Sequence, residues 1–206
     1  MSLRTTLFLV IALVAASCSR HHEQVADKPA NYDVVLLPTP EFPLTEARKV
    51  ATTVANDTGL HVLTALPLGT RDWKPYPDRP QYDPEELKTL ALPVIERLKT
   101  NYGGKVYVIL TSRDIGPSDK SLNFVFTQHF LAQKISVVSA AQMLFDQQGH
   151  QAPLNIIENR LRKMLLRTIA LQYYELQGSS DIRDVTYSPL MSVSDLDQMG
   201  LTLKLK

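Results

Sequence analysis

Short β-rich apolar runs alternate with segments of helical period along most of this chain, and this alternation constrains its fold more than any other feature. The strand candidates are Tyr32–Leu37, Leu60–Leu66, Lys105–Thr111, Leu122–Phe126 and Ile135–Ser139. Strands that alternate with helices form α/β layer structures. We therefore expect an α/β domain, in which helices cover the faces of a β-sheet.

Capping signals place the first two helices. The first is expected between Thr45, a plausible N-cap, and Gly59, a C-terminal stop. Its apolar stripe is Ala47, Val50, Ala51 and Val54. The second begins at Asp83-Pro84 and ends before Gly103, and Pro93 in its interior should kink or split it.

The longest helical pattern covers Pro153–Leu176. Its apolar face is formed by Ile157, Leu161, Met164, Leu165, Ile169 and Leu176, with Arg160, Arg162, Lys163 and Arg167 largely opposite. Such a pattern predicts an amphipathic helix packed against a core. The turn-rich segment Gly178–Lys206 is expected to wrap back over the domain.

The charge balance excludes a large basic surface. The chain has 22 Lys and Arg against 21 Asp and Glu, and residues 1–17 contain one Arg and no acid. A mature chain without them would be balanced, so no field that attracts nucleic acid is expected. With 206 residues and 44% apolar content, a single folded domain is the expectation.

The N-terminus has the features of an export signal. Every residue from Leu7 to Ala16 is apolar, and this run of about ten residues is half of what a membrane-spanning helix needs. Small residues lead from it into Cys18, the only cysteine, so an internal disulfide is excluded. The alternative is an ordinary signal peptide that happens to end near a cysteine.

The segment before Cys18 resembles the lipobox of bacterial lipoproteins. That resemblance implies a diacylated Cys18 as the first mature residue, and a lipid anchor in the bacterial cell envelope. Ser19, in place of an acidic residue, suggests the outer membrane and its periplasmic face. We thus expect a signal peptide at 1–17, a tether at 18–30 and a folded domain at 31–206.

The order of segments in the folded part resembles the archaemetzincins, a family of zinc-dependent metallopeptidases. The matching pieces are Arg79-Pro80-Gln81-Tyr82-Asp83, Lys105–Asp114, Leu122–Phe126, Lys134–Ser139 and the long helix. The resemblance implies a metzincin-like single domain: a twisted mixed β-sheet with packed helices, including a long helix in the C-terminal half.

In that family the long helix carries His-Glu-x-x-His-x-x-Gly-x-x-His, in which the histidines bind zinc and the glutamate activates water. The corresponding positions here are Arg167, Thr168, Leu171, Tyr174 and Gln177, none of which is a zinc ligand or a glutamate base. The family's cysteine-rich second zinc site has no counterpart either. Met191 is the candidate for the methionine turn, at a longer spacing than in the family.

No other chemistry emerges from the sequence. The domain's histidines, His61, His129 and His150, lie on separate segments with no acidic partner at ligand spacing, and each is expected in a loop or at a sheet edge. There is no Gly-x-Ser-x-Gly elbow, phosphate loop or dinucleotide fingerprint. We expect no metal and no cofactor.

These observations favour a membrane-anchored lipoprotein whose archaemetzincin-like domain is catalytically inactive and binds a peptide or protein. The predicted surface is the edge strand Leu122, Asn123, Phe124, Val125 and Phe126, although Phe124 and Phe126 would also suit plain packing. Leu171 and Tyr174 are expected to fill the former zinc site. Two alternatives stay open: a divergent active zinc metallopeptidase, and a structural envelope lipoprotein.

Overall fold

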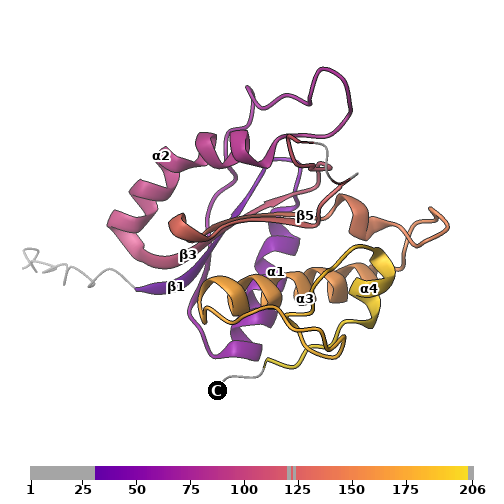
Figure 1. Ribbon diagram of the computed structural model, residues 1–206. Helices are drawn as coiled ribbons and strands as arrows, with labels where there is room; N and C mark the ends of the chain where they lie inside the picture. Colours follow the sequence, from indigo (N-terminus) through magenta and orange to yellow (C-terminus); the bar gives the residue numbers. More distant parts are fainter. Residues whose placement is uncertain (1–30, 120–121, 123, 204–206) are drawn as a thin grey trace, which may run out of the picture.

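A five-stranded mixed sheet forms the centre of the protein (Figure 1). The computed structural model describes residues 31–119, 122 and 124–203. The leader, the tether with Cys18, and Asn123 of the predicted edge strand therefore lie outside the described residues. No helix among the described residues combines the length and the apolar character that crossing a bilayer requires.

Four strands of the sheet run parallel and one runs antiparallel. The strands are β1 (Tyr32–Pro38), β2 (Val62–Thr64), β3 (Gly103–Thr111), β4 (Thr127–Phe130) and β5 (Ile135–Ser139). Their spatial order is β2-β1-β3-β5-β4, and β4 pairs antiparallel with β5 at the edge. The predicted mixed α/β sheet is thus confirmed.

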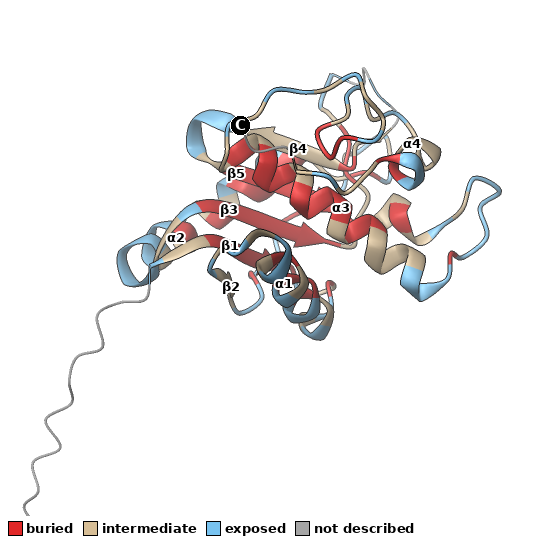
Figure 2. Cartoon of the chain, turned by 90° about the horizontal axis from the view of Figure 1, so that it is seen from below, coloured by how far each residue is buried: buried red, intermediate tan, exposed pale blue. Residues whose placement is uncertain are grey.

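Helices cover both faces of this sheet (Figure 1). They are α1 (Leu44–Thr58), α2 (Pro84–Tyr102), α3 (Leu154–Gln172) and α4 (Val193–Gln198), with short 3-10 turns at Leu131–Gln133 and Ala141–Leu144. Helices α1 and α3 pack on one face, and α2 packs on the other. Figure 2 shows that the buried residues concentrate in β3, β5 and α3.

The central strands are apolar on both sides because both faces are covered. In β3, Val106, Val108 and Leu110 face α1 and α3, whereas Tyr107 and Ile109 face α2. This alternation has the period of two that a strand imposes. It explains why Lys105–Thr111 is the most continuous apolar run in the sequence.

Three of the predicted ends of α1 and α2 are confirmed and one is wrong. Helix α2 ends at Tyr102, directly before Gly103. Gly59 caps α1 in the left-handed conformation, and the Asp83 carboxylate accepts a hydrogen bond from the Glu85 amide at the start of α2. Thr45, however, lies inside α1, and Pro43 holds the N-cap position without a side-chain bond. Helix α2 continues through Pro93 rather than splitting there.

The Arg79–Tyr82 motif has a structural role. It holds the irregular loop that follows β2 against the end of β3. The side-chain amide of Gln81 donates to the Asp114 carboxylate at 3.2 Å, and the backbone N–H of Tyr82 donates to the Asp114 carbonyl at 2.9 Å. The Tyr82 ring packs 4.7 Å from the ring of Trp73, which is fully buried. The motif thereby positions Trp73 in the core under α2.

The sequence suggests that the basic residues of α3 lie largely opposite its apolar face. In the structure two of them, Arg160 and Lys163, are buried because the C-terminal segment covers them. Arg160 is 3% exposed and forms two hydrogen bonds with the Asp197 carboxylate, at 2.6 and 2.7 Å. Lys163 is 6% exposed and donates to the carbonyls of Leu196 and Asp197 at the end of α4. Buried cations need such partners.

We predict that Arg160→Ala lowers the free energy of unfolding by about 2–4 kcal/mol, since it breaks an ion pair whose arginine is buried and leaves the carbonyls of Met143 and Phe145 without their donor. The matched control is Arg162→Ala, which breaks a pair with Asp57 whose arginine is 34% exposed and should cost about 1 kcal/mol or less. Urea unfolding measures both. Equal losses would contradict this account of α3.

Candidate functional site

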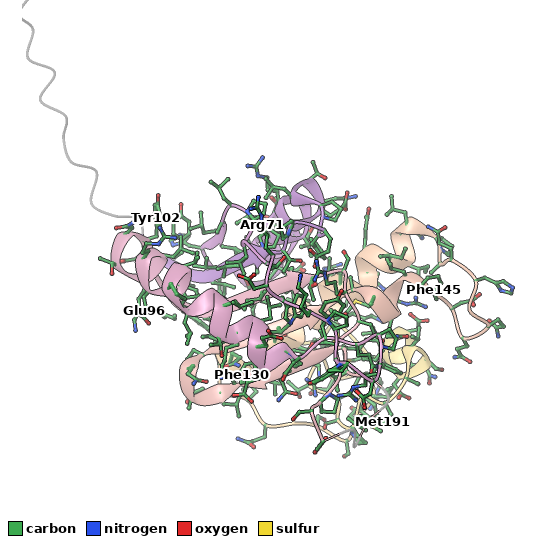
Figure 3. The ribbon with its side chains drawn as sticks, turned by 90° about the horizontal axis from the view of Figure 1, so that it is seen from above. Arg71, Glu96, Tyr102, Phe130, Phe145 and Met191 are labelled. Carbon is green, nitrogen blue, oxygen red and sulfur yellow. The ribbon has the colours of Figure 1, made fainter. Side chains whose placement is uncertain are left out.

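A pocket of about 410 Å³ opens between the edge of the sheet, α3 and the C-terminal segment. Its walls are Leu122, Phe124, Val125, Phe126, Thr127, His129, Met164, Arg167, Leu190 and Met191. Most of these side chains are apolar, and Arg167 is the one charged residue among them at neutral pH. Met191 is 55% exposed and lies at the periphery of the molecule (Figure 3).

The segment predicted as the edge strand lines this pocket, but it is not a strand. The edge strand is β4, which begins directly after this segment, at Thr127. The described residues of 122–126 are irregular. Two backbone bonds hold them: the Val125 amide donates to Ile115, and the Phe126 carbonyl accepts from Ser139. Phe124 and Phe126 pack edge to face at 5.2 Å. The prediction of a strand here is therefore wrong, and the described residues of the segment form one wall of the pocket.

The five positions that correspond to the zinc motif do not converge on one place. Arg167 faces the pocket, whereas Thr168 is fully buried and donates to the Met164 carbonyl within α3. Leu171 and Gln177 line a second cavity of about 640 Å³, which Lys134 and Glu175 also line and which shares His129 with the first. Tyr174 follows α3 and packs against the neighbouring Tyr173 ring.

The expectation that Leu171 and Tyr174 fill a former metal site is therefore only partly met. Both side chains are partly buried, but Leu171 borders an open cavity rather than a dry core. The side chain that approaches the pocket from α3 alongside Met164 is Arg167.

A short chain of hydrogen bonds fixes Arg167. Its Nη1 donates to His129 Nε2 at 3.3 Å, and its Nε donates to the Tyr187 carbonyl at 3.3 Å. His129 Nδ1 lies 2.9 Å from Ser136 Oγ, which also accepts from Gln172 Nε2. Because Nε2 must accept from a guanidinium, the imidazole is neutral and carries its proton on Nδ1.

Burial and the neighbouring cation both keep His129 neutral. Its ring is half-buried, and this loss of solvation together with the charge of Arg167 lowers the His129 pKa from 6.5 to about 4. Burial also lowers the pKa of Arg167, although a guanidinium stays charged at any physiological pH. Among the described residues, no carboxylate forms an ion pair with Arg167.

The side chains in this region do not suit zinc. Tetrahedral zinc sites use three or four His, Cys or carboxylate ligands. Within the described part of the chain, no group of three or more His, Cys, Asp or Glu could hold a metal ion. The single imidazole at the pocket, His129, is held by a cation that would repel Zn²⁺.

Comparison with known proteins shows a likeness in fold only. The sequence matches no protein-family profile, and no curated protein matches it. The crystal structure of a zinc-dependent peptidase from Methanocorpusculum labreanum superimposes with a TM-score of 0.66 at 16% identity, over 83% of this chain and 95% of that one.

Two archaemetzincin structures agree with this. The archaemetzincin from Archaeoglobus fulgidus, in complex with malonate, gives a TM-score of 0.61 at 18% identity, over 84% of this chain and 95% of that one. The archaemetzincin from Methanopyrus kandleri gives 0.61 at 20% identity, over 84% and 89%. The fold is archaemetzincin-like. The resemblance read from the sequence is thus confirmed for the fold.

Sequence reasoning missed several pocket residues of this archaemetzincin-like domain. His129 was assigned correctly to a sheet edge, but nothing in its local sequence indicates that Arg167, 38 residues later, would lie against it. Leu190 belongs to a segment without periodicity. In the same segment Met191 did carry a signal, as the candidate for the methionine turn, and it lines the pocket.

We predict that the neutral state of His129 makes stability depend on pH. Because folding lowers its pKa, the contribution is fully present above about pH 6.5 and is lost as the pH falls toward about 4, by up to about 3 kcal/mol. His129→Gln should flatten this dependence in urea unfolding. The exposed His61→Gln is the matched control and should retain it; a slope unchanged in His129→Gln would refute the assignment.

Proposed function

We propose that this protein is a lipid-anchored envelope protein whose archaemetzincin-like domain has no peptidase activity and binds an extended peptide or a protein segment. One observation carries the proposal. At the place where α3 faces the pocket beside the edge strand, the side chains are a guanidinium and a neutral imidazole in contact with each other. These groups suit recognition rather than metal-assisted hydrolysis, which needs a bound cation and a water activated by it.

The pocket's position supports peptide binding. Strand β4 is the outermost strand of the sheet, and among the described residues it pairs with β5 alone. An exposed edge can accept an extended peptide as a further strand, while pockets beside it select side chains. The apolar walls next to β4 provide such a pocket.

The N-terminal sequence supports a lipid anchor. The apolar run that ends at Ala16 is too short to span a bilayer, and Cys18 directly follows small residues, as in bacterial lipoproteins. A lipid on Cys18, the first residue of the tether at 18–30, would hold the domain at the periplasmic face of the outer membrane. The partner would then be an envelope protein or peptide.

The shared fold with zinc peptidases favours one other function, a divergent active metallopeptidase. We expect the full chain, purified in detergent, to contain far less than one zinc per molecule after dialysis, and to leave a peptide mixture uncleaved. Elemental analysis and mass spectrometry of the mixture measure the two. Close to one tightly held zinc per chain, with cleavage that a chelator abolishes, would establish the alternative.

We predict that Cys18→Ser abolishes labelling by a fatty-acid probe and releases the protein from the membrane fraction, since serine cannot carry the thioether lipid. The matched control is Ser19→Ala, which changes the neighbouring residue and should remain labelled and membrane-bound. Labelling that persists in Cys18→Ser would eliminate the lipid anchor.

A further inference from the structure

Arg167 differs from the other arginines of α3, and from Arg113, in having no described carboxylate partner. Arg160 and Arg162 on the same helix pair with Asp197 and Asp57, and Arg113 pairs with Glu41. Arg167 faces a pocket whose walls are mostly apolar, and none of the described carboxylates pairs with it. Its charge is therefore half-buried, with no described opposite charge beside it.

The contacts that Arg167 does make leave much of its hydrogen-bonding capacity unused. A guanidinium has five N–H donors in a planar fork. Two are engaged, each at 3.3 Å and each with a neutral acceptor, the Tyr187 carbonyl and His129 Nε2. Bonds between a guanidinium and a carboxylate are shorter and about twice as strong. The His129 ring fixes the fork without neutralising it.

We propose that this pocket binds the C-terminal residue of a peptide, with the Arg167 guanidinium donating to the terminal carboxylate and the apolar walls enclosing the last side chain. This inference rests on the proposed peptide-binding role and specifies its ligand. The pocket has a single cation among mostly apolar side chains. A C-terminal residue with an apolar side chain matches it, because its carboxylate and its side chain are attached to the same Cα. An internal acidic side chain offers the charge without the apolar group.

The free edge of β4 could bind the residues that precede the C-terminal one in such a peptide. A chain that enters beside β4 would use its main-chain hydrogen bonds along that strand and end at Arg167, as in other recognition modes that add a strand. Thr127, the first residue of β4, also lines the pocket, and its buried hydroxyl has no hydrogen-bond partner among the described residues. It is a second donor close to the site.

The test uses the full chain in detergent and fluorescein-labelled alanine-rich peptides that end in Leu, Phe, Val or Met. Each is made in three forms: with a free terminal carboxylate, with a terminal amide, and with a terminal amide plus an internal Glu. Fluorescence polarisation measures the affinity. We expect the free-acid form of at least one peptide to bind about 10- to 100-fold more tightly than its amide.

Arg167→Met removes the charge while keeping an unbranched side chain, and should abolish the preference for the free acid. Its thermal midpoint should equal or exceed that of the wild type, because a desolvated charge is lost. Arg167→Lys should keep part of the preference, since lysine retains the charge without the fork. Arg162→Met, on the same helix but away from the pocket, should bind like the wild type.

The outcomes separate this inference from the proposed function. Equal binding of acid and amide, unaffected by Arg167→Met, would leave peptide binding intact and refute carboxylate recognition. Preference for the internal Glu form would refute the terminal residue as the ligand. Binding of none of the peptides would overturn the inference, and their cleavage would overturn the proposed function itself. A large fall in the thermal midpoint of Arg167→Met would show that the residue serves stability.

Discussion

The structure depends on the burial of both faces of its parallel strands. Strands β1, β3 and β5 are covered by α1 and α3 on one side and by α2 with Trp73 on the other. A parallel sheet needs this double cover, and every connection between parallel strands must cross over a face. The antiparallel β4 is the exception. It pairs with β5 without a crossover over either face, and its outer edge lies at the surface beside the pocket.

The parts of the fold that were predictable from the sequence are those with strong local signals. Strand β5 and the stripe Ala47, Val50, Ala51 and Val54 of α1 are buried as periodicity predicts. Asp83 and Gly59 end their helices because their capping preferences are local and strong. Thr45 misled because a proline, Pro43, can precede a helix without any side-chain cap.

The other errors share one cause, which is that contacts distant in sequence decided the outcome. Leu122–Phe126 has the composition of a strand, but β5 takes Thr127–Phe130 as its partner instead. The burial of Arg160 and Lys163 depends on residues more than 30 positions later. The same holds for the pocket: Arg167 stood out only because it replaces a family ligand, and its neighbour His129 had no signal at all. Contacts between residues distant in sequence cannot be predicted from local hydrophobic periodicity or capping signals.

The cations of α3 also make the packing of the domain depend on its C-terminal segment. Arg160 and Lys163 lie in the middle of a central helix, yet their acceptors belong to Leu196 and Asp197, near the end of the chain. Until those residues fold back onto α3, the rest of the domain holds a guanidinium and an ammonium charge against its core without these partners. A domain that forms from its N-terminus therefore stays loosely packed until the segment that contains Leu196 and Asp197 is in place.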